Sequence, residues 1–123
     1  MAAIAILDDY QHVALRMADW SRLQQGNKIV AFTERLPDVE SQARALADFD
    51  VIGIMRERTP FTPALFDKLP KLRLLVTTGK RNASIDLEAA KVRNVTVCST
   101  GGAGRATAEL AFALMLGLAR HLR

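Results

Sequence analysis

The sequence is organised as short apolar runs separated by longer segments with helical patterns. The runs occupy residues 3–7, 28–32, 51–55, 72–77 and 95–98. None of them alternates apolar with polar residues, which is typical of strands buried on both faces of a parallel sheet. Because strands alternate with helices, the connections are expected to be right-handed crossovers. We therefore predict an α/β fold: a flavodoxin-like, doubly wound parallel sheet of five strands in the order 2-1-3-4-5.

The segments between the apolar runs carry signals for the beginning and end of helices. We predict helices over residues 13–23, 37–49 and 62–69, and a fourth from Ser84 or Asp86 to Asn94. Proline is favoured in the first turn of a helix, so Pro37 and Pro63 are placed there. Thr62 directly precedes Pro63 and is expected to be the N-cap.

The last segment, residues 106–122, has an unusual pattern. It is apolar on nearly every side, and Glu109 is its only charged residue before Arg120. A helix of this kind must be buried on all sides, and a sheet covers only one of them. We divide the chain into a flavodoxin-like domain (1–103) and a hinge with an interdomain or dimerisation helix (104–123). The alternatives are a truncated protein and a core helix within a monomer.

Composition excludes several classes of protein. The 123 residues are half apolar and about a quarter charged, as in a single globular domain. The single cysteine, Cys98, cannot form an internal disulfide and is expected to pack within its strand. The longest apolar run has ten residues and no basic start precedes an apolar N-terminal segment, so neither a membrane span nor a signal peptide is expected. A cytoplasmic location is the resulting prediction.

The charge pattern bears on possible partners. Seventeen Lys and Arg against thirteen Asp and Glu give a net charge of +4, but the basic residues are scattered along the chain. Nucleic-acid binders concentrate such charge on one face, so no nucleic-acid partner is expected. A few well-placed arginines are still sufficient for a small anion.

Polar and glycine-rich residues follow the ends of the predicted strands. They lie at residues 8–11, 56–59, 77–82 and 99–102. In open α/β sheets, ligands bind at the carboxyl ends of the strands, near the point where the strand order reverses. Guanidinium groups and the N–H groups of a glycine turn are donors suited to a carboxylate or phosphate. We therefore predict a small-anion site at this edge; ordinary polar loops are the alternative.

Two further patterns imitate known sites. Residues 102–107 resemble the start of a dinucleotide-binding loop but lack its final glycine, and a flexible hinge is the alternative interpretation. Asp8 and Asp9 resemble the acidic pair of receiver domains, yet Arg56 follows the third run, where a receiver needs a phosphoacceptor aspartate. Neither His12 nor His121 has an Asp or Glu at a sequence spacing that indicates a catalytic pair. No catalytic residue and no metal site are predicted in this chain.

Three motifs in order, supported by residues 7–11, carry a family resemblance. They are Arg56–Thr59, residues 77–87 and residues 107–111. Together they resemble the N-terminal, substrate-binding part of the D-isomer-specific 2-hydroxyacid dehydrogenases, a group that includes phosphoglycerate dehydrogenase relatives. The resemblance covers essentially the whole chain.

The resemblance implies roles for individual residues. Arg56 would face the substrate carboxylate, and the turn of Thr78, Gly79 and Lys80 would bind it through backbone N–H groups. Thr107 would lie near the nicotinamide of NAD or NADP in the complete enzyme. Residues 83–86 (Ala-Ser-Ile-Asp) depart from the Asn-Ile-Asp variant of the glycine loop, which leaves the substrate preference open.

In that family, the cofactor domain and the catalytic arginine, glutamate and histidine follow the last helix. They are absent from these 123 residues. The expected ligand is therefore a small 2-hydroxy or 2-keto acid, and the expected protein partner is a second copy bound through residues 106–122. Tight NAD binding and turnover by this chain alone are not expected. A stand-alone module for small anions or dimerisation is the alternative, and a degenerate receiver domain is a more remote one.

Overall fold

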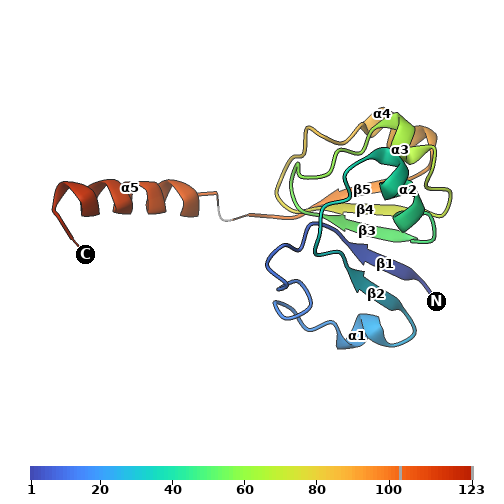
Figure 1. Ribbon diagram of the computed structural model, residues 1–123, viewed down its shortest axis with the longest axis horizontal. Helices are drawn as coiled ribbons and strands as arrows, with labels where there is room; N and C mark the ends of the chain where they lie inside the picture. Colours follow the sequence, from blue (N-terminus) through green and yellow to red (C-terminus); the bar gives the residue numbers. More distant parts are fainter. Residues whose placement is uncertain (103, 123) are drawn as a thin grey trace.

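A computed structural model describes residues 1–102 and 104–122. Its centre is a parallel sheet in the order β2-β1-β3-β4-β5, so the predicted topology is confirmed (Figure 1). The strands are β1 (Ala3–Ile6), β2 (Lys28–Ala31), β3 (Val51–Ile54), β4 (Leu74–Thr77) and β5 (Thr96–Ser99). Each lies within or one residue beyond a predicted apolar run. The boundary predicted between residues 103 and 104 involves Ala103, which lies outside the described residues.

One face of the sheet carries the hydrophobic core. Ala5, Ile52 and Leu75 are aligned across β1, β3 and β4, and none of them is exposed to solvent. Three helices supply the other half of the core (Figure 1): α2 (Val39–Leu46), α3 (Pro63–Phe66) and α4 (Leu87–Val92). Their buried side chains include Leu46, Leu65, Phe66 and Ala90.

Side-chain caps determine where these three helices begin. Asp38 accepts a hydrogen bond from Ser41 N at 2.8 Å, and Asp86 accepts one from Ala89 N at 2.8 Å. The predicted cap of Thr62 followed by Pro63 is confirmed. Since Asp38 is the cap of α2, Pro37 lies before the helix and not in its first turn. All three helices are shorter than predicted.

The prediction of a helix over residues 13–23 is wrong: only α1 (Ser21–Gln24) forms. The carboxylate of Asp9 accepts hydrogen bonds from both Val13 N and Ala14 N, and the Trp20 indole donates to Ala14 O at 2.9 Å. The two N–H groups that Asp9 binds would have no partner inside a helix beginning at residue 13, whereas the Ala14 carbonyl is the acceptor that such a helix would use for the N–H of residue 18. The Trp20 bond therefore competes with a continuous helix. The chain therefore forms turns before α1 begins.

The second face of the sheet is only partly covered, contrary to the prediction that both faces are buried. Its side chains on β1, β3 and β4 are half-buried: Ile4, Ile6, Val51, Leu74 and Val76. Cys98 is aligned with Val76 and is exposed, so the expectation that it packs in the interior is also wrong. Among the residues that the structure describes, the strand of Cys98, β5, is at the edge of the sheet.

Helix α5 (Ala106–Ala119) extends away from the sheet (Figure 1). It is shorter than the predicted 106–122, and none of its residues is buried. Its large apolar side chains are between 55% and 77% exposed, in contrast to those of the core. Within residues 1–102 and 104–122, no helix combines the length and apolar content of a membrane span.

Truncation of a side chain at the centre of the core should strongly reduce the stability of the fold. Leu75→Ala should lower the free energy of unfolding by about 2–5 kcal/mol, because it removes a fully buried side chain and leaves a cavity. Val92→Ala is the matched control: Val92 is 77% exposed, and we expect a change of about 0.5 kcal/mol or less. Urea unfolding measures both. Equal effects of the two variants would contradict the assignment of the core.

Candidate functional site

The carboxyl ends of β1 and β3 form the centre of the candidate site. These strands are neighbours, and the chain turns from β1 to β2 on one side and continues through β3 to β5 on the other. Ligands of open α/β sheets bind at such a reversal. Asp8 and Arg56, just after these strands, both have left-handed backbone, with φ of 61° and 51°. This conformation is strained for residues with a side chain, and such strain is concentrated at functional sites.

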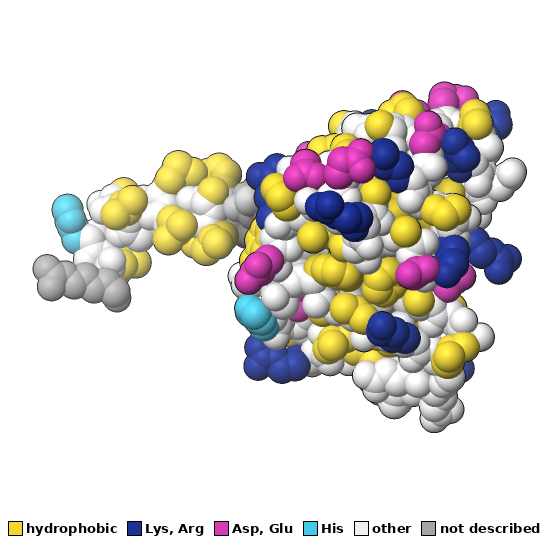
Figure 2. Space-filling model, turned by 45° about the vertical axis from the view of Figure 1, so that its right-hand side comes forward, with side chains coloured by type: hydrophobic (Ala, Val, Ile, Leu, Met, Phe, Trp, Pro, Cys, Tyr) yellow, Lys and Arg dark blue, Asp and Glu magenta, His cyan; other side chains and the backbone are white. Residues whose placement is uncertain are grey.

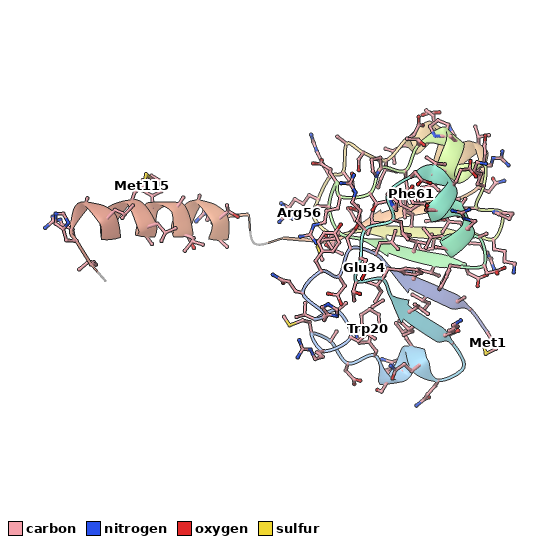
Figure 3. All side chains as sticks on the ribbon, viewed as in Figure 1. Met1, Trp20, Glu34, Arg56, Phe61 and Met115 are labelled. Atoms are coloured by element: carbon pink, nitrogen blue, oxygen red, sulfur yellow. The ribbon has the colours of Figure 1, made fainter. Side chains whose placement is uncertain are left out.

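Arg56 is held at this edge by its backbone. Its N–H donates to Thr78 Oγ1 at 3.1 Å, and its carbonyl accepts a hydrogen bond from Asn82 Nδ2. Its side chain is exposed, and in the described part of the chain its guanidinium takes part in no ion pair. Figure 3 shows Arg56 at the end of the sheet domain that is turned towards α5. The fixed backbone and unpaired guanidinium leave this cation available to an anion.

The predicted turn of Thr78, Gly79 and Lys80 lies directly beside Arg56. Gly79 has φ of 94°, which a glycine adopts without strain. Two N–H groups of the turn already have partners: Thr78 N donates to Ile54 O at 3.1 Å, and Gly79 N donates to Thr100 Oγ1 at 2.9 Å. An anion at Gly79 would therefore have to replace the Thr100 hydroxyl as acceptor. The Lys80 side chain is exposed.

Asn82 lies within the predicted polar segment 77–82, but its role in positioning the neighbouring loops was not predicted. Its Nδ2 donates to Thr77 Oγ1 at 2.9 Å as well as to the Arg56 carbonyl, and its Oδ1 accepts from Ser84 N at 2.9 Å. It thereby fastens the loop after β4 to the loop after β3. The only local signal was an Asn two residues before a Ser, which is typical of an Asx turn. The long-range bond to Arg56 leaves no mark in the sequence.

Asp8 organises the loop after β1. It is 2% exposed, and its carboxylate accepts hydrogen bonds from Tyr10 OH and Thr59 Oγ1, both at 2.8 Å. Its backbone carbonyl accepts from Arg58 Nη1 at 2.8 Å, and the Arg58 guanidinium stacks over the Tyr10 ring at 4.8 Å. Arg58 is thus occupied by protein groups, whereas Arg56 is not. The two arginines of this loop therefore have different surroundings.

Both carboxylates of the acidic pair accept hydrogen bonds from groups of the protein. Asp8 holds Tyr10 and Thr59, and Asp9 accepts the two N–H groups after residue 12. In the described residues, no group of three His, Cys, Asp or Glu side chains is arranged to hold a metal ion. The resemblance of the pair to a receiver domain therefore has no further support from its surroundings.

Thr107 lies apart from the other predicted site residues. It is exposed on the first turn of α5, away from the sheet edge (Figure 1). The nearby glycines also form no cradle for a dinucleotide: a Cβ at Gly101, Gly102 or Gly104 would meet no atom within 4 Å. The remaining residue of this loop, Ala103, lies outside the described part. The described residues of this loop therefore do not form a binding site for the pyrophosphate of NAD.

A cavity lies next to the loop after β4. It has a volume of about 480 Å³, with Lys80, Arg81 and Asn82 on one side and Val97 to Ser99 of β5 on another. Two cations and no carboxylate line it. Arg56 is not among its lining residues, so this space extends the candidate site along the edge without enclosing it.

The pKa of Tyr10, the single tyrosine, depends on its contact with Asp8. The pKa of Tyr10 is raised above its ordinary value of 10.0, chiefly because its hydroxyl donates to the Asp8 carboxylate, and also through burial and the negative charge of Asp8. The stability that this contributes is fully present below pH 10 and is lost as pH rises through the raised pKa.

We predict that Asp8→Asn returns the Tyr10 pKa towards its ordinary value, which an ultraviolet titration of the single tyrosine measures. Asn is chosen because it tolerates left-handed backbone. Asp48→Asn removes a carboxylate that is bonded to Lys71 instead, and should leave the titration unchanged. An unchanged Tyr10 titration in folded Asp8→Asn would show that Asp8 does not control the phenol.

Comparison with known proteins now identifies the family. A family model described as "D-isomer specific 2-hydroxyacid dehydrogenase, catalytic domain" matches residues 4–116. Formate dehydrogenase 1 of Saccharomyces cerevisiae is 33% identical over 105 residues, which are 80% of this chain and 27% of the yeast protein.

Two solved structures are similar. The phosphoglycerate oxidoreductase of Vibrio cholerae has 38% identity and a TM-score of 0.84, covering 99% of this chain and 38% of that one. The NAD⁺-bound 3-phosphoglycerate dehydrogenase of Entamoeba histolytica has 18% identity and a TM-score of 0.76, covering 94% and 38%, and shows likeness of fold. The chain thus spans well under half of each of these relatives. It belongs to the D-isomer specific 2-hydroxyacid dehydrogenase family, within the catalytic domain.

Proposed function

We propose that this chain is the substrate-binding part of an NAD(P)-dependent oxidoreductase that acts on the CH–OH group of D-2-hydroxy acids. The complete enzyme would transfer hydride between a 2-hydroxy acid and the corresponding 2-keto acid. The observation that carries the proposal is Arg56: an exposed guanidinium without an ion pair in the described residues, on a strained and clamped backbone at the reversal of strand order. Membership of the family supports it.

The proposed role of these residues is to bind and orient the substrate carboxylate. Arg56 would pair with the carboxylate by charge-assisted hydrogen bonds, and Lys80 would add a second positive charge. Gly79 N–H would donate to a carboxylate oxygen in place of the Thr100 hydroxyl, which is its present acceptor. Fixing the carboxylate would set the position of the adjacent C2 atom, where the CH–OH group reacts.

The cofactor belongs to a part of the enzyme other than the sheet edge. NAD or NADP, when bound, supplies the hydride acceptor or donor. The NAD⁺-bound neighbour from Entamoeba histolytica supports the use of this cofactor in the complete enzyme. Since the described residues around Gly101 to Thr107 form no cradle, we propose that other residues hold the dinucleotide. Thr107 would lie close to the nicotinamide only after such a part is added.

Removal of the guanidinium tests the proposed site. Arg56→Ala should weaken binding of a small 2-hydroxy acid, such as D-lactate, by about 1–3 kcal/mol, because a charge-assisted bond is lost. Calorimetric titration measures the affinity. Arg44→Ala removes the same charge from an exposed position on α2 and should leave it unchanged. Equal affinity of Arg56→Ala and the wild type would place the site elsewhere.

We expect the isolated 123-residue chain not to catalyse the oxidation of D-2-hydroxy acids. Mixed with NAD⁺ and D-2-hydroxy acids, it should produce no NADH above the rate without protein, since its residues bind substrate and do not hold the cofactor. A D-2-hydroxyacid dehydrogenase assayed in the same buffer is the positive control. Formation of NADH that depends on this chain would contradict the proposal that this chain binds the substrate while other residues hold the cofactor.

A second candidate is a stand-alone module that binds small anions and dimerises. The exposed apolar side chains of α5 favour the pairing part of this reading, because water-exposed apolar surface of this extent promotes association. We propose that two copies pair through residues 106–122. The exposed free thiol of Cys98 suits a reducing compartment such as the cytoplasm, where we place the protein.

If two copies pair through α5, a single charged residue introduced on this helix should dissociate the dimer. Leu114→Asp should convert a dimer to a monomer in light scattering, because it would bury an unpaired carboxylate. Glu88→Gln changes one charge on α4 and is the control that should remain dimeric. A dimer that persists in Leu114→Asp would place the interface outside α5.

A further inference from the structure

We propose that Arg81 binds a second carboxylate of the substrate, so that the preferred substrate is a short dicarboxylic 2-hydroxy acid. This inference rests on the proposed function and adds the class of substrate. Arg56 and Gly79 would hold the carboxylate next to the CH–OH group, and Arg81 would hold the other carboxylate. The space for it is the cavity of about 480 Å³ between β5 and the loop after β4.

The Arg81 side chain is available to an anion. It is exposed and lines the cavity, and among the residues that the structure describes it takes part in no ion pair. Lys80 lines the same cavity, whereas no Asp or Glu does. Figure 2 shows Lys and Arg side chains at the end of the domain next to α5, where the strands have their carboxyl ends. A guanidinium without an acidic partner is suited to bidentate binding of a carboxylate.

The loop that carries Arg81 is fixed on both sides of this residue. Before it, Thr78 N donates to Ile54 O at 3.1 Å. After it, Asn82 Nδ2 donates to Thr77 Oγ1 at 2.9 Å. A backbone that is already held in place loses little conformational entropy when an anion binds. The loop therefore presents the Arg81 side chain from a fixed position.

The two carboxylate positions are close enough for one small molecule. Arg56 follows β3 and Arg81 lies in the loop after β4, and these two strands are neighbours. Asn82 joins the two loops, because its Nδ2 donates to the Arg56 carbonyl. Neighbouring strands lie about 4.8 Å apart, and the three carbon–carbon bonds that join the carboxyl carbons of a four-carbon diacid span roughly 4 Å. Such a diacid therefore has the length to contact both loops.

The surroundings of the cavity favour a carboxylate over a phosphate. Phosphate sites use successive backbone N–H groups or the N-terminus of a helix. Two such N–H groups beside the cavity already have carboxylate acceptors: Ala83 N donates to Glu57 Oε1 at 3.2 Å, and Ala89 N donates to Asp86 Oδ1 at 2.8 Å. These carboxylates would repel a doubly charged phosphate more strongly than a singly charged carboxylate.

Three small 2-hydroxy acids test the assignment: D-malate, D-2-hydroxybutyrate and D-3-phosphoglycerate. The first two have four carbons each and differ in the second carboxylate, and the third carries a phosphate instead. Amide chemical shifts of the full 123-residue chain, followed during titration, give the three affinities. We expect D-malate to bind about tenfold more tightly than D-2-hydroxybutyrate, because it forms a second charge-assisted hydrogen bond, and also more tightly than D-3-phosphoglycerate.

Variants of Arg81 connect this preference to the cavity. In Arg81→Gln, D-malate should bind no more tightly than D-2-hydroxybutyrate. Arg81→Lys keeps the positive charge and should keep part of the preference. Arg44→Gln removes one charge from an exposed position on α2 and is the matched control, in which the full preference should persist. Circular dichroism checks that each variant is folded.

Three results would overturn the inference. The first is equal affinity of the wild type for D-malate and D-2-hydroxybutyrate. The second is a preference for D-malate that persists in Arg81→Gln, and the third is tighter binding of D-3-phosphoglycerate than of D-malate. A failure of the proposed function is distinguishable from these: Arg56→Ala would then bind D-2-hydroxybutyrate as tightly as the wild type does, and the inference would be lost with it.

Discussion

Parallel pairing of the five strands is the constraint on which the rest of the structure depends. It brings the carboxyl ends of β1, β3 and β4 to one edge, although these residues are more than twenty positions apart in the chain. Asp8, Arg56 and Thr78 meet there, and hydrogen bonds between their loops fix the candidate site. A loop with strained backbone, such as that of Arg56, is maintained only because the surrounding strands and the side chain of Asn82 hold it.

The same sheet explains the unequal coverage of the two faces. Helices α2, α3 and α4 cover one face and bury its central residues completely. On the other face, α1 is a single turn and α5 extends away, so an apolar floor is left half-exposed. The apolar floor and the exposed apolar helix are two surfaces of one chain with the same need for a cover.

The topology and the cap of α3 could be predicted because their causes are periodic or local. Continuous apolar runs indicated buried parallel strands, and the pair Thr62 and Pro63 marked the start of α3. The helix expected over residues 13–23 does not form: the Trp20 indole binds the Ala14 carbonyl, an acceptor that such a helix would need, and periodicity does not report this contact. The hydrogen-bond partners of the site residues could not be predicted from the sequence either. Thr100 binds the Gly79 N–H group across 21 positions, and Asn82 binds the Arg56 carbonyl across 26. Such contacts exist only once the sheet has formed.

The central claim is that the edge beside Arg56 and Gly79 binds the carboxylate of a small 2-hydroxy acid. Backbone amide chemical shifts of the isotope-labelled chain, followed during titration with D-lactate, test it most directly. The account predicts saturable shifts confined to the loops after β3 and β4, with Gly79 N–H among the most affected because its acceptor changes from the Thr100 hydroxyl to a carboxylate. An absence of saturable shifts, or shifts confined to another surface such as α5, would contradict it.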